Sequence, residues 1–194
     1  MSGFHDYFSL ADKDLSAARL IVFSGCSGSG KSSYMRFLSQ KHPDFRGTNS
    51  SLIDTGRPLE WPRIDKNTLA QLVLVDECLV RRDVVQIARL LRQGHTVIAA
   101  SHLPPYAFAP LGLVWKSRHF ALDRHVGKIA HELEQRDYCF TADAVSRFVK
   151  QHGASYSALD MVVENADTPD FDAAFARFEK FNRVEVIRNY RQGR

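Results

Sequence analysis

One stretch of the chain has the residue types and spacing of a phosphate-binding loop. Residues 25–32, GCSGSGKS, fit G-x-x-x-x-G-K-[ST] at every fixed position and follow an apolar run at 20–23. Glycines permit the φ angles that let backbone N–H groups point at phosphate oxygens. Lys31 would reach the β and γ phosphates, and the Ser32 hydroxyl would bind Mg²⁺. The expected nucleotide-binding residues are Gly25, Cys26, Ser27, Gly28, Ser29, Gly30, Lys31, Ser32 and Ser33.

The alternative interpretation of this stretch is a Gly/Ser-rich turn that binds nothing. We favour the phosphate loop because strand, loop and helix signals occur in the required order.

A second segment carries two adjacent acids at the end of a buried strand. Residues 72–75 are apolar throughout and are followed by Asp76 and Glu77, which is a Walker B pattern. Ligands of open α/β sheets bind at the carboxyl ends of the strands. Asp76 would therefore hold Mg²⁺ directly or through water, and Glu77 would act as general base on a water molecule. An ordinary strand end with solvated acids is the alternative.

A third segment places a histidine at the end of another predicted strand. Residues 96–100 have the pattern of a buried strand, follow a helix-period segment that ends at Gly94, and lead into Ser101 and His102. A polar side chain that leaves a strand beside the Walker B strand can approach the γ-phosphate. We expect His102 to respond to that group, with a plain surface histidine as the alternative.

Together the segments GCSGSGKS, LVLVDE and GHTVIAASH resemble the additional-strand, catalytic-glutamate division of P-loop NTPases, and within it the ATP-binding-cassette ATPases. The resemblance covers roughly residues 18–103. It implies that Lys31 and Ser32 bind phosphate and magnesium, and that Asp76 binds magnesium. It also implies that Glu77 acts on the attacking water and that His102 is the switch histidine on the γ-phosphate.

The sequence also departs from the cassette pattern. No LSGGQ-like signature occurs, and the interval from Lys31 to Asp76 is too short for the helical subdomain that carries it. No glutamine stands convincingly at the Q-loop position, whereas Asp83 falls where the D-loop aspartate would be. We therefore expect slow ATP hydrolysis by the protein alone, with a partner or self-association supplying missing cationic or N–H groups.

These patterns predict a three-layer α/β P-loop NTPase fold with a mostly parallel sheet and a helical C-terminal extension. The expected core strands lie near 20–24, 51–54, 72–76 and 96–100, with one or two closing strands at 113–115 and 119–122. We expect one domain over 1–194, with a nucleotide-binding core at about 18–122 and a helical extension at about 123–194.

Several details of the extension and the flanks are also predicted. Thr141 would cap one helix, Ser157 with Asp160 would form a capping box, and a further helix would begin at residues 168–169. Residues 184–187 could add a terminal strand. The N-terminal aromatic residues would either stack on a purine or pack on the core; they are Phe4, Tyr7 and Phe8.

Charged residues outside the motifs have two competing interpretations. Arg118 and Arg124 could close over the phosphates as a lid, and residues 54–57 could form a switch, although solvated turn residues are favoured. Two further groups of arginines are a solvated helix face and a basic C-terminal end that could contact nucleic acid or an acidic protein. They are Arg81, Arg82, Arg89 and Arg92, and Arg183, Arg188, Arg191 and Arg194.

Composition limits the classes of function. A net charge of +4 is compatible with a nucleotide ligand but too small to indicate nucleic-acid binding by itself. Three dispersed cysteines without metal-binding spacing, and no signal or membrane-spanning pattern, predict a cytoplasmic protein.

We expect a Mg-dependent ATP-binding protein that hydrolyses ATP to drive a conformational or assembly change, with a protein partner or a homo-oligomer. The alternatives are a kinase that passes the γ-phosphate to an acceptor, and a nucleotide-gated binding module with little turnover.

Overall fold

The computed structural model describes residues 4–54, 71–164 and 166–192, with the backbone alone from residue 183 onward. Within this part the chain forms two compact units, Met1–Leu122 and Asp123–Arg194. Each unit has its own apolar core. The expectation that the whole chain is a single domain stays a prediction.

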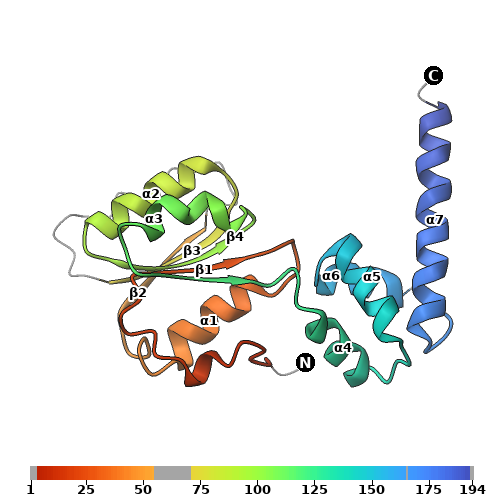
Figure 1. Ribbon diagram of the computed structural model, residues 1–194, viewed down its shortest axis with the longest axis horizontal. Coiled ribbons are helices and arrows are strands. Elements are labelled where there is room, and N and C mark those ends of the chain that lie inside the picture. Colours follow the sequence, from red (N-terminus) through yellow and green to blue (C-terminus); the bar gives the residue numbers. More distant parts are fainter. Residues whose placement is uncertain (1–3, 55–70, 165, 193–194) are drawn as a thin grey trace. The chain divides into compact units, whose positions relative to one another are not determined.

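The first unit is built on a five-stranded parallel sheet with the order β2-β3-β4-β1-β5 (Figure 1). The strands are β1 Leu20–Ser24, β2 Ser50–Asp54, β3 Leu72–Cys78, β4 Thr96–Ser101 and β5 Ser117–Ala121. This confirms the predicted α/β fold class and the four predicted core strands. Because all five strands are parallel, their carboxyl ends share one edge, where ligands of such sheets bind.

Helices cover both faces of this sheet (Figure 1). Helix α1, Lys31–Lys41, lies on the face formed by the side chains of Ile21, Phe23, Ile98 and Ala100. The opposite face is covered by α2 (Arg81–Arg92), the 3-10 helix η2 (Pro105–Phe108) and the short helix α3 (Ala109–Gly112). Alternate residues of each strand therefore enter different layers, which explains why the central strands are apolar without interruption.

One sequence prediction around the sheet needs correction. Residues 113–115 form no strand, because the amides of Val114 and Trp115 turn back to the carbonyl of Leu111; β5 alone closes the sheet. Before this turn, residues 105–108 form η2 and residues 109–112 form α3.

The N-terminal aromatic residues pack on the core, the second of their two predicted roles. The Phe4 ring stacks on Phe37 at 4.7 Å, and Phe8 lies 5.4 Å from Tyr34. Tyr7 donates its amide to the Tyr34 hydroxyl at 2.9 Å. These contacts fasten the segment before β1 to helix α1.

The second unit consists of helices α4 Val126–Gln135, α5 Ala142–His152, α6 Tyr156–Val163 and α7 Phe171–Gln192 (Figure 1). Thr141 caps α5 as predicted, its hydroxyl accepting the Ala144 amide. The predicted capping box at Ser157 is wrong: Ser155 caps α6, and Asp160 pairs with Arg136 at 2.7 Å. Residues 184–187 continue helix α7, so the predicted terminal strand is also wrong.

Candidate nucleotide-binding site

The candidate phosphate loop connects the end of β1 to the start of α1. Gly28 and Gly30 have φ angles of 70° and 83°, the left-handed region that L side chains rarely adopt. Lys31 is buried, and its ammonium donates to the carbonyls of Gly25 at 3.1 Å and Cys26 at 2.7 Å. The positive charge is thus held within the loop, at the N-terminus of a helix, where an anion is also stabilised by backbone N–H groups.

The hydroxyl of Ser32 meets the first Walker B acid. Ser32 lies in the first turn of α1, and its Oγ donates to Oδ1 of Asp76 at 2.9 Å. Asp76 stands on β3, separated from β1 by β4 in the sheet. A hydroxyl and a carboxylate at this distance are oxygen ligands that suit Mg²⁺ together with phosphate oxygens and water.

The two Walker B acids lie in an irregularity of strand β3. Val75 pairs with Ala99 and Cys78 pairs with Ser101, so β3 has one extra residue against β4 between these pairs. Glu77 takes up the irregularity with a φ of 57°, unusual for a residue with a side chain. Bulges next to active sites redirect side chains.

The carboxylate of Glu77 contacts the candidate sensor histidine. Its Oε2 lies 3.2 Å from Nε2 of His102, and both side chains are partly exposed. The Glu77 amide donates to Oδ1 of Asp76 at 3.0 Å, which ties the two acids together. The structure therefore places Asp76, Glu77 and His102 at the carboxyl edge of neighbouring strands.

A set of hydrogen bonds around Ser101, which the sequence interpretation did not use, fixes this edge. The Gly25 amide donates to the Ser101 carbonyl at 3.2 Å, and the Leu103 amide donates to the Ser101 hydroxyl at 2.9 Å. The His102 amide and the Ser101 hydroxyl both donate to the carbonyl of Cys78. The phosphate loop, the end of β3 and His102 are thus linked through β4. In the sequence, the feature that could have indicated this role of Ser101 is a polar residue at the end of an apolar strand.

The thiol of Cys78 takes no part in this hydrogen-bond network. Burial raises the pKa of its thiol far above the ordinary value, with the carboxylates of Asp83 and Asp76 acting in the same direction. The thiol is neutral at physiological pH, and only its carbonyl is used.

Asp83 has a structural role that differs from the D-loop position suggested by the resemblance. It is buried in the first turn of α2, and its Oδ2 accepts the amides of Leu79 and Val80, each at 3.0 Å. The carboxylate caps the helix and fixes the short connection after Glu77.

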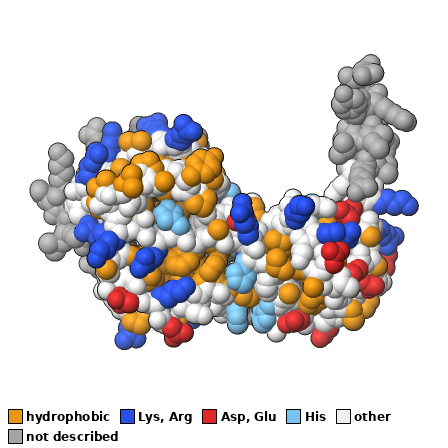
Figure 2. Space-filling model, in the orientation of Figure 1, with side chains coloured by type: hydrophobic (Ala, Val, Ile, Leu, Met, Phe, Trp, Pro, Cys, Tyr) orange, Lys and Arg blue, Asp and Glu red, His pale blue; other side chains and the backbone are white. Residues whose placement is uncertain are grey.

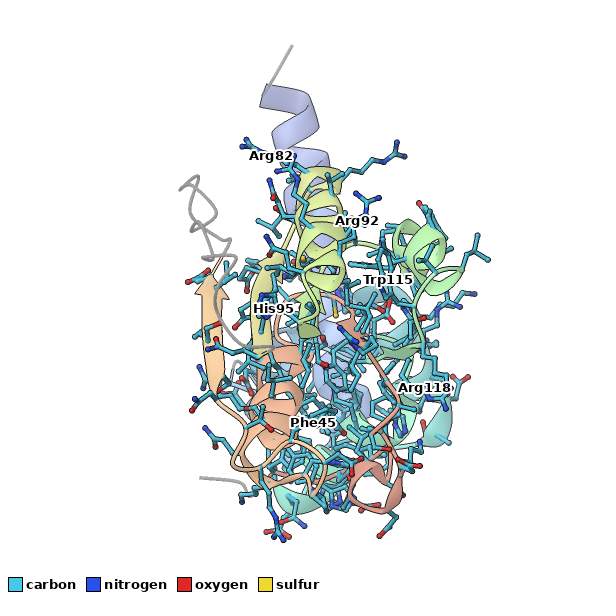
Figure 3. The ribbon with its side chains drawn as sticks, turned by 90° about the vertical axis from the view of Figure 1, so that its left-hand side faces the viewer. Phe45, Arg82, Arg92, His95, Trp115 and Arg118 are labelled. Carbon is cyan, nitrogen blue, oxygen red and sulfur yellow. The ribbon has the colours of Figure 1, made fainter. Side chains whose placement is uncertain are left out.

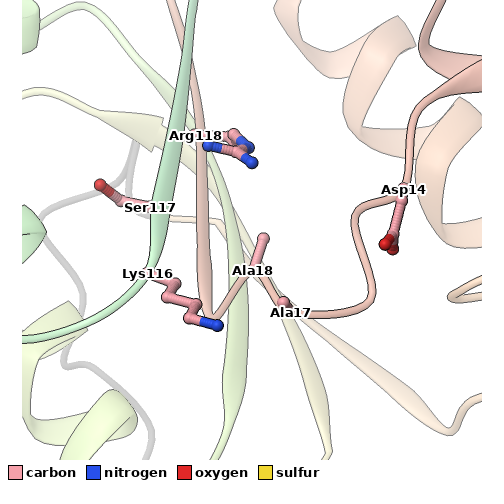
Figure 4. Close-up of a pocket in the computed structure, with 6 residues that line it drawn as sticks. All are labelled: Asp14, Ala17, Ala18, Lys116, Ser117 and Arg118. Carbon is pink, nitrogen blue, oxygen red and sulfur yellow. The ribbon is translucent and has the colours of Figure 1, made fainter.

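Of the other charged residues singled out in the sequence, Arg118 lies away from this edge and Asp54 lies at it. Arg118 pairs in register with Ile21, well before the carboxyl end of β1, and lines a separate pocket with Asp14, Ala17, Ala18 and Lys116 (Figure 4). Arg124 belongs to the second unit. Asp54 ends β2 opposite Asp76, whereas Thr55 and Arg57 lie outside the described residues.

Two further features are absent from the described residues. No group of three or more His, Cys, Asp or Glu side chains in this part could hold a metal ion. No described helix has the length and apolar content needed to span a bilayer.

The first unit is thus a three-layer α/β fold in which a glycine-rich loop joins the first strand of a parallel sheet to a helix. No family model matches the sequence, and no curated protein matches it. Among solved structures the chain is similar to the crystal structure of Cdc6p from Pyrobaculum aerophilum, with 14% sequence identity and a TM-score of 0.41. The similarity covers 80% of this chain and 52% of that chain, so this chain spans about half the length of that protein.

Proposed function

We propose that this protein binds Mg-ATP at the loop of residues 25–33 and hydrolyses it to drive a change of conformation or assembly. One observation carries the proposal: the Ser32–Asp76 and Glu77–His102 pairs meet at the strand edge where the phosphate loop begins. Three separate sequence segments thus converge on one place that can hold a triphosphate.

Each residue then has a distinct role in binding. The loop amides and the Lys31 ammonium bind the β- and γ-phosphate oxygens. Ser32 and Asp76 would hold Mg²⁺, which when bound neutralises charge on the phosphates. The oxygen chemistry and the 2.9 Å separation of this pair fit that ion.

The same geometry supports hydrolysis. Glu77 accepts a proton from a water molecule as the water oxygen bonds to the γ-phosphorus and the bond from that phosphorus to the bridging oxygen breaks. ADP leaves, and the γ-phosphoryl group becomes inorganic phosphate. His102, whose Nε2 lies 3.2 Å from Oε2 of Glu77, would orient that carboxylate and respond to the γ-phosphate.

The position of β4 supports the finer family assignment that the sequence suggested. This strand lies between the phosphate-loop strand β1 and the Walker B strand β3, and it carries His102 at its end. An inserted strand together with Glu77 is what the additional-strand, catalytic-glutamate division would require. We retain assembly through a partner or a second copy, and a cytoplasmic location, as parts of the proposal.

Binding is tested by calorimetry with Mg-ATP. Lys31→Ala removes the one point charge of the loop and should abolish or greatly weaken binding. Ser32→Ala should weaken binding in Mg²⁺ more than binding in EDTA. Ser39→Ala, an exchange of a hydroxyl in the last turns of the same helix, is the control and should bind normally. Wild-type affinity in both loop variants would remove the assignment.

A further inference from the structure

Helix α2 presents a ridge of arginines, which we call the arginine face: Arg81, Arg82, Arg89 and Arg92. All four are exposed on a helix of 12 residues. At 3.6 residues per turn they fall within an arc of about 100°, with Val85 among them. The opposite side of α2 is buried on the sheet through Ile87, Leu90 and Leu91.

Among the described residues, these arginines have no acidic partners of the kind that arginines of the second unit have. In the described part of the chain none of the four forms an ion pair; Arg89 bonds only the neutral Gln86 amide oxygen, at 3.0 Å. Arg136, Arg147 and Arg177 each contact a carboxylate. No acidic side chain appears over α2 and α3 on the face that Figure 2 shows.

Like charges on one helix face repel one another. A bound polyanion would reduce this repulsion and so lower the free energy of the arginine face. Arg82 and Arg92 extend from α2 near its two ends (Figure 3). At a rise of 1.5 Å per residue the ridge is about 16 Å long, long enough to meet several consecutive phosphates of one strand. The planar guanidinium group matches phosphate oxygens in two hydrogen bonds.

Exposed apolar and aromatic side chains lie next to the arginine face. Leu79, Val80 and Val85 are each about half exposed, and Tyr106 of η2 is 75% exposed. Helix η2, which carries this tyrosine, contacts helix α2. An exposed aromatic ring on an element that contacts the arginine helix could stack on bases while the arginines hold the phosphate backbone.

We infer that the arginine face of α2 binds the phosphate backbone of a nucleic acid, a site separate from the proposed ATP site. The net charge of the chain did not indicate such a partner; the local arrangement of arginines does. An acidic protein is the competing occupant that the experiment must reject.

The test is fluorescence anisotropy of labelled 30-mer DNA, single-stranded and duplex, with the full chain and without ATP. The variant Arg81→Gln, Arg82→Gln, Arg89→Gln, Arg92→Gln should bind at least 10-fold more weakly at 50 mM salt. The slope of log K against log salt should fall by at most about 2.8 for single-stranded DNA and about 3.6 for duplex DNA, which is about 0.7 and 0.9 for each of four phosphates no longer neutralised.

The matched control removes the same charge from exposed positions of the first unit: Arg36, Lys41, Arg46 and Lys116, each changed to Gln. This control variant should bind DNA with an affinity within about threefold of the wild type. The pairs Arg81→Gln/Arg82→Gln and Arg89→Gln/Arg92→Gln should each lose part of the salt slope, which keeps the test valid if the fourfold variant unfolds.

Three results would overturn the inference: no DNA binding by the wild type at 50 mM salt, equal weakening in the control, or displacement of DNA by equimolar poly-glutamate. The last result would assign the face to an acidic protein. Because ATP is omitted, failure here leaves the proposed ATP site untouched, and failure of ATP binding leaves this test intact.

Discussion

Glu77 shows how the backbone at one residue can be adapted to chemistry. Its φ of 57° lies in a region that costs a residue with a Cβ about 1–2 kcal/mol. The irregular pairing of β3 with β4 and the contact with His102 hold it there. The site thus contains a locally unfavourable conformation where the proposed general base stands.

This conformation predicts an unusual order of stabilities at position 77. Glu77→Gly should be more stable than Glu77→Ala by about 1 kcal/mol, because glycine adopts a positive φ without strain. Urea unfolding measures the difference. In Glu134, exposed within helix α4, the same pair of exchanges should give the opposite order, since glycine weakens a helix. An Ala variant at 77 that equals or exceeds the Gly variant would contradict the strain.

At the scale of elements, the short connection between β3 and α2 links the site to the helix that follows it. Asp83→Ala leaves the amides of Leu79 and Val80 without their carboxylate acceptor. We expect a loss of about 1–3 kcal/mol of unfolding free energy and a lower rate of ATP turnover. The control is Asp143→Ala, because Asp143 is also in the first turn of a helix, α5, but is exposed. This exchange should lower the free energy of unfolding by less than about 0.5 kcal/mol. Equal losses in the two variants would show that Asp83 has no special role.

The helical unit should lose stability in mild acid because of His152. Burial against Phe148 and Phe178 lowers the pKa of this imidazole, with Glu179 opposing the effect. The unfolded chain therefore binds a proton more readily, so stability should fall as pH falls from about 7 through the ordinary histidine pKa of about 6.5.

The exchange His152→Phe should make unfolding less dependent on pH between 7.5 and 5, as followed by urea unfolding. Lys150→Gln, exposed on the same helix, should leave that dependence unchanged. A His152→Phe protein with the wild-type pH profile would show that another group titrates.

How much the sequence could predict depends on the element. Runs such as 72–75 predicted buried strands because a strand covered on both faces must be apolar throughout. The same reasoning failed at 184–187, where β-branched residues occur within a helix, and at 113–115, where an apolar triplet forms a turn. Loop residues 25–32 and the partners Asp76 and His102 could be found from spacing. The φ of Glu77 and the capping role of Asp83 depend on strand register, which no local pattern reveals.

At the scale of the whole molecule, the proposed assembly predicts a dependence on both nucleotide and concentration. Because no cassette signature completes the site, activity per molecule should rise with protein concentration. Light scattering should detect a larger species with ATP than with ADP or without nucleotide. The Lys31→Ala protein serves as the control and should not change. A monomer in every state with fast, concentration-independent hydrolysis would contradict assembly.

The most direct test of the central claim compares ATP binding and phosphate release in wild type and Glu77→Gln, with enzyme in excess over Mg-ATP. Glutamine keeps the shape and hydrogen-bonding capacity of Glu77 but cannot accept the proton. Affinity for ATP should stay within about threefold while the rate of phosphate release falls by roughly two to four orders of magnitude. Glu77→Gln protein that releases phosphate at the wild-type rate would contradict the assignment of Glu77 as the base.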